Sequence, residues 1–166
     1  MAASVLVLAA VITARPNAVG SPADAATPPV PVVGASPDAA RPPAGETVLE
    51  RQADGHFYAD VTVNGRPLTM LVDTGASFIA LTAADADALG LTWSENDAVV
   101  IGEGASGPVM GIPLRLDSVE VGDHRASGVD GAIIPEGLGI SLLGQSFLAQ
   151  INNVAIRGDR MVLGEP

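Results

Sequence analysis

The chain has 166 residues, which is enough for one domain with a hydrophobic core and too few for two large domains. Its 8 basic and 19 acidic residues give a net charge of -11, which argues against nucleic acid or an anionic membrane surface as the partner. It contains no lysine and no cysteine, so Schiff-base chemistry, thiol catalysis, disulfides and thiolate metal sites are excluded. Its two histidines are too few for a histidine-rich metal site, and we expect no metal and no cofactor.

The first 45 residues have the composition of a leader followed by a tether. Residues 2–14 form an apolar run without charge, too short to span a bilayer comfortably, and residues 1–20 resemble a secretory signal or an N-terminal anchor. No basic residue precedes this run, which leaves open whether Met1 is the true start. Residues 21–45 are rich in proline and alanine and predict a disordered linker. We therefore expect a folded domain over residues 46–166 that is exported or membrane-anchored on the periplasmic, extracytoplasmic side.

The first part of the folded region predicts a β-hairpin that ends at an aspartate. Residues 56–63 alternate between apolar and polar, Asn64-Gly65 is a preferred two-residue hairpin turn, and residues 66–72 form the returning strand. That strand delivers Asp73. A short helix over residues 83–89 follows, with Thr82 as its cap and Gly90 as its stop, and its aspartates Asp85 and Asp87 are expected on the surface.

The rest of the chain predicts short strands separated by turns. A glycine-rich turn at residues 102–107 lies between two β-like segments of residues 98–116 and predicts a projecting hairpin. The further predicted elements are a hairpin of residues 119–121 and 125–134, a buried strand at 140–144, a helical turn at 145–150, and a hairpin of residues 153–157 and 160–163. This spacing predicts a mainly β fold, a small closed β-barrel with one or two short helices.

The loop after the first hairpin has the residue types that acid/base chemistry needs. Three apolar residues, Met70 to Val72, precede Asp73-Thr74-Gly75-Ala76-Ser77. Apolar surroundings make a carboxylate harder to ionise, a neighbouring hydroxyl and backbone N–H groups orient it, and glycine allows a close turn. An ordinary β-turn between two strands is the alternative for the tripeptide alone. The apolar flanks favour a catalytic loop.

Together with the projecting hairpin and with Leu142-Leu143-Gly144, this loop resembles the active site of retropepsin-like aspartic proteases of clan AA, in particular single-domain bacterial members. The resemblance covers about residues 50–163. It implies the acid protease fold, with Asp73 as the catalytic residue, Thr74 bonding across the catalytic pair, Gly75 donating its N–H toward the carboxylate, and Ala76 and Ser77 lining the floor. The implied flap over the substrate is formed by Gly102, Glu103, Gly104, Ala105, Ser106 and Gly107.

Some positions depart from the family pattern. The flap has no aromatic residue, and Gln145 stands where relatives often have methionine after the Leu-Leu-Gly element. Trp93 could line a pocket, although a packing role fits a single tryptophan better. Ile133 and Ile134 are a possible partner strand for the Leu-Leu-Gly element. Residues that could face substrate pockets, with a core role as the better interpretation of each, are Leu81, Val100, Ile101, Val109 and Ile134.

The number of catalytic groups predicts the assembly. Aspartic proteases use two carboxylates that share a proton, and this chain has a single Asp-Thr-Gly. The resemblance therefore implies a homodimer in which each subunit supplies Asp73, acting as an endopeptidase on polypeptide substrates. The alternative is a catalytically inactive module of the same fold that binds peptides or mediates assembly, which the plain flap and the lack of a second catalytic group favour. A serine hydrolase is not supported, because neither histidine accompanies a nucleophile motif.

Overall fold

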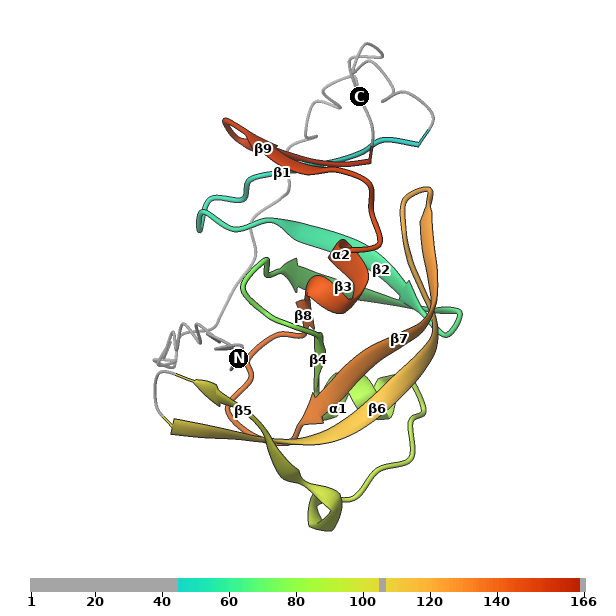
Figure 1. Cartoon of the computed structure of the whole chain (residues 1–166), viewed down its shortest axis with the longest axis vertical. Helices are drawn as coiled ribbons and strands as arrows, with labels where there is room; N and C mark the ends of the chain where they lie inside the picture. The colour runs from blue at the N-terminus through green and yellow to red at the C-terminus, as the bar shows by residue number, and fades with distance from the viewer. Residues whose placement is uncertain (1–44, 105–106, 165–166) are drawn as a thin grey trace, which may run out of the picture. The chain divides into compact units, whose positions relative to one another are not determined.

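Residues 45–104 and 107–164 are described by a computed structural model (Figure 1). The predicted signal or anchor and nearly all of the predicted linker lie outside the described residues. Within the described residues, no helix is both long enough and apolar enough to cross a membrane.

The described residues form two β-sheets and three short helices. A three-stranded antiparallel sheet has the order β1 (Thr47–Glu50), β10 (Arg160–Leu163), β9 (Val154–Arg157). The larger sheet has the order β2 (Tyr58–Val63), β3 (Arg66–Val72), β8 (Leu142–Leu143), β4 (Ile79–Thr82), β7 (His124–Ile134), β6 (Gly107–Val121), β5 (Val99–Gly104). Because β2 also pairs with β6, the sheet closes on itself as a ring. The helices are α1 (Ala83–Ala88), the 3-10 helix η1 (Glu95–Asp97) and α2 (Gln145–Leu148). The mainly β prediction is confirmed.

The predicted first hairpin is confirmed, although its first strand begins at Tyr58 and not at residue 56. In β2 the side chains of Ala59, Val61 and Val63 are buried and those between them are not, so the alternation in the sequence corresponds to an inner and an outer face. The turn between β2 and β3 has positive φ at both Asn64 (49°) and Gly65 (79°), as a type I′ turn requires. Burying a valine such as Val61 or Val63 contributes roughly 1.5–3 kcal/mol to folding.

Two predictions about strands are wrong. Strand β6 does not end at residue 116 but continues to Val121, because its whole second half pairs with β7 in a single register, from Ile112 opposite Ile133 to Val121 opposite His124. Ile133 and Ile134 are not partners of the Leu-Leu-Gly element. Strand β8 pairs with β3 in parallel and with β4, and β4 lies between β8 and β7.

Helix α1 begins at the predicted cap, but one of its aspartates is not a surface residue. Thr82 accepts a hydrogen bond from the backbone N–H of Asp85 (3.1 Å). The Asp85 carboxylate is half-buried and accepts a hydrogen bond from the hydroxyl of Ser141, a fully buried residue whose oxygen also accepts from the N–H of Thr82 (3.0 Å). Asp87 is exposed as predicted and accepts a hydrogen bond from the indole of Trp93 (2.9 Å). Hydrogen bonds of Ser141 therefore connect the start of helix α1 to the segment directly before β8.

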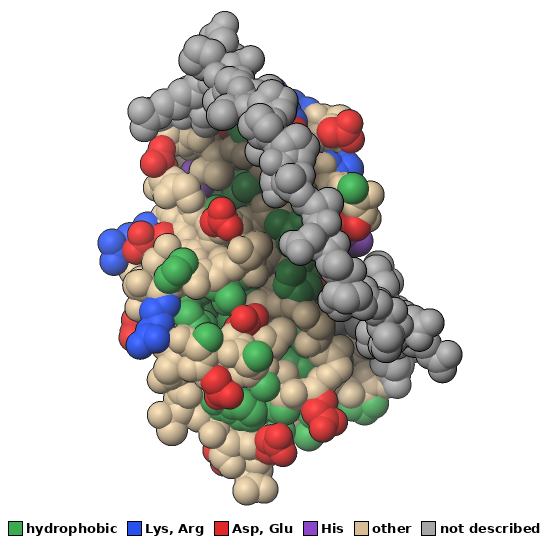
Figure 2. All heavy atoms as spheres, turned by 180° about the vertical axis from the view of Figure 1, so that it is seen from behind, with side chains coloured by type: hydrophobic (Ala, Val, Ile, Leu, Met, Phe, Trp, Pro, Cys, Tyr) green, Lys and Arg blue, Asp and Glu red, His purple; other side chains and the backbone are tan. Residues whose placement is uncertain are grey.

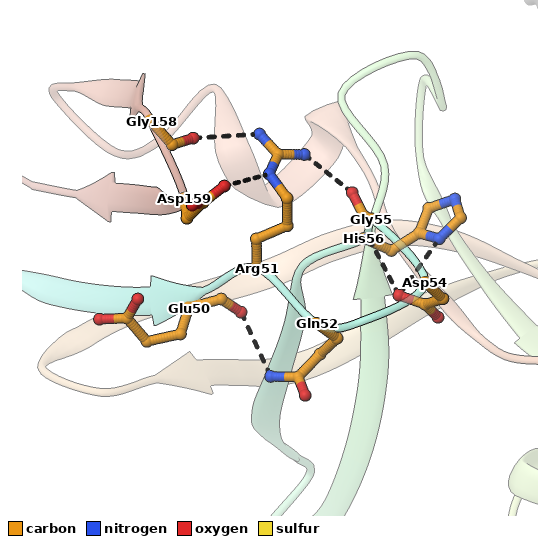
Figure 3. A network of polar contacts seen from close by, with 8 residues as sticks. All are labelled: Glu50, Arg51, Gln52, Asp54, Gly55, His56, Gly158 and Asp159. Carbon is orange, nitrogen blue, oxygen red and sulfur yellow. Dashed lines mark hydrogen bonds and ion pairs between the residues drawn. The ribbon is translucent and has the colours of Figure 1, made fainter.

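A polar network joins the three-stranded sheet to the turn before β2 (Figure 3). Arg51, directly after β1, donates hydrogen bonds to the carbonyl oxygens of Gly55 (2.8 Å) and Gly158 (3.2 Å). Its guanidinium also forms an ion pair with Asp159 (3.4 Å) and lies 4.4 Å from the centre of the Phe57 ring. One side chain thus contacts both the β9–β10 hairpin and the chain entering the larger sheet.

Candidate active site

Asp73 directly follows the last residue of β3, the strand that lies between β2 and β8. Val72, the last residue of β3, is 8% exposed, and the backbone N–H of Asp73 donates to the carbonyl of Leu143 in β8 (3.1 Å). The Asp73 side chain is half-buried, whereas Thr74 and Gly75 are exposed. The strand pairing therefore places a single carboxylate at the border between the core and the surface.

The Asp73 carboxylate is oriented by its own loop. Oδ1 accepts a hydrogen bond from the backbone N–H of Gly75 (2.8 Å), and the carbonyl of Asp73 accepts from the N–H of Ala76 (3.3 Å). Such a turn, in which an aspartate accepts from the backbone two residues on, holds the carboxylate in one direction. Among the described residues, nothing hydrogen-bonds to the other oxygen, Oδ2, which leaves it available to solvent or substrate.

Gln145, the first residue of α2, donates two hydrogen bonds to the Asp73 loop. Its side-chain amide donates to the carbonyl of Thr74 (2.8 Å), and its backbone N–H donates to the carbonyl of Ala76 (2.8 Å). These two bonds hold the carbonyl groups on either side of Gly75. From the sequence, Gln145 was noted only as a departure from the family pattern. Its contact with Thr74, 71 residues earlier, could not be predicted because no local sequence pattern indicates it.

Strands β5 and β6 form the predicted flap hairpin. Gly102, Glu103 and Gly104 lie in β5, and Gly107 opens β6 opposite Gly104. The pairing shifts register between residues 100 and 102, as at a β-bulge. Ala105 and Ser106, the tip of the predicted flap, lie outside the described residues.

A cavity of about 560 Å³ lies between the Asp73 loop and the β5–β6 hairpin. Its walls come from the residues after Asp73, from residues 95 and 98 at η1, from the hairpin and from the turn after β7, and most of them are apolar. It is lined by Ala76, Ser77, Phe78, Ala80, Glu95, Ala98, Ile101, Gly104, Pro108, Val109, Met110, Ile134, Pro135, Glu136, Gly137, Leu138 and Leu142. Ala76 and Ser77 thus contribute to its floor.

The candidate pocket residues divide into two groups. Ile101, Val109 and Ile134 line the cavity and also pack in the small apolar cluster beneath it. Leu81 is fully buried in the main core, as the core interpretation predicted. For Val100 both interpretations are wrong, because it is 62% exposed and lines neither the cavity nor a core cluster. Trp93 packs against the main core, as its packing interpretation predicted.

Several lining residues were not among the candidates from the sequence. Phe78 and Met110 are apolar residues next to predicted site segments, and this adjacency was the available signal. Glu95 begins η1, and Glu136 and Leu138 lie in the turn after β7. The fold brings these two segments together, and nothing in their local sequence indicated a shared site.

The comparisons with known proteins agree with this geometry. The family model described as "gag-polyprotein putative aspartyl protease" matches residues 59–150, more than half of the chain. The chain is also similar to a retropepsin-like aspartic protease from Rickettsia conorii of known crystal structure, with 34% identity and a TM-score of 0.61, covering 72% of this chain and 89% of that one. The chain belongs to the retropepsin-like aspartic protease family. The segments that carry the family resemblance, the Asp73 loop and the Leu142-Leu143-Gly144 element, lie inside the matched region.

Other relatives extend the likeness without adding a function. The EIAV protease, solved in complex with the inhibitor HBY-793, has the same fold at 19% identity and a TM-score of 0.51, over 64% of this chain and 97% of that one. Uncharacterized proteins from a Sinorhizobium species (in the cobV 5′ region) and from Rickettsia prowazekii are each 36% identical over 119 residues, 71% and 72% of this chain. The chain spans about half the length of these two curated relatives, 51% of each.

Proposed function

We propose that this protein is an aspartic endopeptidase that hydrolyses peptide bonds with a water molecule activated between two copies of Asp73. The observation that carries the proposal is the half-buried Asp73 carboxylate, which Gly75 orients beside an apolar cavity in a chain of the retropepsin-like family. In such a site one carboxylate accepts a proton from the water and the other donates a proton to the substrate carbonyl.

The second carboxylate must come from a second chain, because the sequence contains one Asp-Thr-Gly. We propose a homodimer with two-fold symmetry, in which each subunit places its Asp73 loop against that of its partner. The exposure of Thr74 and Gly75 supports this arrangement, since residues at the centre of such an interface are uncovered in a single chain.

The substrate in this proposal is a polypeptide in extended conformation. An extended peptide can use its backbone hydrogen bonds for affinity while alternate side chains enter pockets on one side. The β5–β6 hairpin would cover the peptide, and the cavity between this hairpin and Phe78 would receive one apolar side chain.

The test is peptidase activity of the full chain against an unfolded protein substrate from acidic to neutral pH. We expect Asp73→Asn to reduce the rate more than about 1,000-fold, because losing one member of a catalytic unit removes most of its effect. Asp117→Asn is the matched control, since Asp117 is an exposed aspartate of β6. Equal cleavage by wild type and Asp73→Asn would show that Asp73 is not catalytic. A wild-type dimer that binds peptides without cleaving them would instead indicate a peptide-binding or assembly module.

A further inference from the structure

The cavity beside the Asp73 loop has apolar walls and two acidic side chains. Phe78, Met110 and Leu138 are among the side chains that form its apolar surface. Glu95 in η1 and Glu136 in the turn after β7 also line it, and both are exposed. A ligand in this cavity would therefore bury apolar atoms while lying close to two hydrated carboxylates.

No positive charge balances these two carboxylates within the described structure. Neither Glu95 nor Glu136 forms an ion pair there, and the lining of the cavity includes no arginine. Figure 2 agrees with this distribution, because the lower end of the face it shows carries acidic and apolar side chains and no Lys or Arg side chain. Four arginines are committed to ion pairs with acidic residues elsewhere: Arg51, Arg115, Arg125 and Arg160.

An extended peptide can satisfy both features of the cavity. Its side chains alternate between two faces, so residues two positions apart lie on the same side, about 6.4–6.8 Å from each other. When one apolar side chain enters the cavity, the side chain two positions away reaches the rim. A positively charged side chain there would lie in the field of the two carboxylates.

We propose that the cavity selects peptides with an apolar residue and a basic residue two positions from it, and that Glu95 and Glu136 determine the preference for the basic residue. This inference rests on the proposed function, because it names the substrate class of that same site. The occupant is thus a basic-apolar peptide segment.

The size of the expected preference follows from the exposure of the two carboxylates. Ion pairs between exposed groups are weak, and each carboxylate should change affinity by about two- to five-fold. Salt screens such interactions, with a Debye length of about 3 Å at 1 M ionic strength against about 10 Å at 0.1 M. The apolar part of the binding does not share this dependence.

The experiment measures peptide binding to the full chain carrying Asp73→Asn, so that cleavage does not interfere. The probes are nine-residue peptides with one central leucine in a neutral background and with Arg, Gln or Glu two positions before and after it. We expect the Arg peptide to bind most tightly and the Glu peptide least tightly. The ratio of their dissociation constants should be smaller at about 1 M salt than at about 0.1 M salt. Adding Glu95→Gln or Glu136→Gln should each reduce the preference, whereas Asp117→Asn should leave it unchanged.

Each contrary outcome has a distinct meaning. Equal affinities for the Arg and Gln peptides, or no binding of any peptide, overturn this inference. If wild type nevertheless cleaves proteins, the proposed function stands and only the preference is wrong. If the partner subunit covers the cavity, Glu136→Gln will alter the dimer dissociation constant and not peptide selection, which also overturns the inference. If wild type cleaves nothing but the Arg preference appears in binding, the proposed hydrolysis fails and the selectivity remains.

Discussion

Gly144 packs so closely against the Asp73 loop and the segment after it that there is no room for a side chain at this position. A Cβ at this position would lie 2.2 Å from the carbonyl oxygen of Phe78 and 2.8 Å from that of Ala76. Both neighbours are backbone atoms of the loop and of the segment following it, so they cannot move away as a flexible side chain would. The glycine of the Leu-Leu-Gly element is therefore required by close packing against the Asp73 loop.

We predict that Gly144→Ala destabilises the protein by about 1–3 kcal/mol, because inserting a methyl group into a packed site displaces its surroundings. The free energy of unfolding, measured in urea, tests this. Gly139→Ala is the control, since a Cβ there has no heavy atom within 4 Å. Equal stability of the two variants would contradict the packing argument. Any activity that Gly144→Ala retains should be lower than that of Gly139→Ala, because the loop must shift.

At the scale of residues, the sequence predicted what lies within one contiguous segment. The Asp73 loop was recognised because its apolar flanks, its carboxylate and its glycine are neighbours in the chain. The contacts of Gln145 and the lining by Glu95 and Glu136 could not be predicted, because they join segments that meet only after folding. Amphipathic patterns indicate that a side chain is buried but not which distant segment covers it.

At the scale of elements, a hydrogen bond joins an aspartate in the connection from β1 to β2, Asp54, to the first residue of β2, Tyr58. The hydroxyl of Tyr58 donates a hydrogen bond to Asp54 (2.5 Å), and the backbone N–H of His56 donates another (3.0 Å). The bond from Tyr58, followed by that from His56, lowers the pKa of Asp54 below its ordinary value. The same hydrogen bond to Asp54 raises the pKa of Tyr58 above its ordinary value of 10.0. The two groups thus favour the state with Asp54 ionised and Tyr58 neutral.

We predict that Asp54→Asn lowers the pKa of Tyr58 toward 10.0. Tyr58 is the only tyrosine in the chain, so the ultraviolet absorbance of its phenolate reports this pKa directly. Asp60→Asn, which removes an exposed carboxylate bonded to Thr69, should change the pKa less. An unchanged tyrosine titration in Asp54→Asn would contradict the coupling.

The pH dependence of stability follows from the two directions. Because the pKa of Asp54 is lower in the folded than in the unfolded chain, Asp54 stabilises the fold at pH values above its unfolded-state pKa. This stabilisation is lost as the pH falls through the folded-state pKa of Asp54. Because the pKa of Tyr58 is higher in the folded chain, Tyr58 stabilises the fold below about pH 10. This stabilisation is lost as the pH rises through the folded-state pKa of Tyr58. The stability difference between wild type and Asp54→Asn should therefore be largest between these two limits.

The elements with local signals were predicted well, and their order in the sheet was not. The turn Asn64-Gly65, the cap Thr82 and the hairpin β9–β10 each depend on a few adjacent residues. Strand β6 was predicted as two pieces, because Asp117 and Ser118 interrupt its apolar pattern, yet pairing along β7 keeps it continuous. The insertion of β8 between β3 and β4 depends on pairings between distant segments, for which one sequence contains no local pattern.

At the scale of the whole molecule, the proposed active unit contains two identical chains. One chain presents one Asp73 at its surface, and a symmetric pair would bring the two together. The motif and the hairpins were sufficient to predict the fold class. The two-chain assembly was predicted from a count of catalytic carboxylates and not from any surface pattern.

We predict that Asp73→Asn acts as an inhibitor of wild type when the two are mixed. Random exchange of subunits in an equal mixture would leave about a quarter of the dimers with two intact aspartates. The peptidase rate at constant total protein should fall accordingly, to well below the half expected of independent monomers. The Asp117→Asn variant, mixed in the same way, should not reduce the rate. A rate of one half with Asp73→Asn would mean that each chain works alone.

The support of the Asp73 loop by Leu143, Gly144 and Gln145 also has a consequence for biosynthesis. A ribosome makes the loop about 70 residues before it makes these partners, and chains fold from the N-terminus as they emerge. Until residues 142–145 are available, the carbonyls of Thr74 and Ala76 lack the donors that hold them, and β3 lacks its neighbour β8. The loop and its carboxylate therefore take their final geometry only after residues 142–145 have been made.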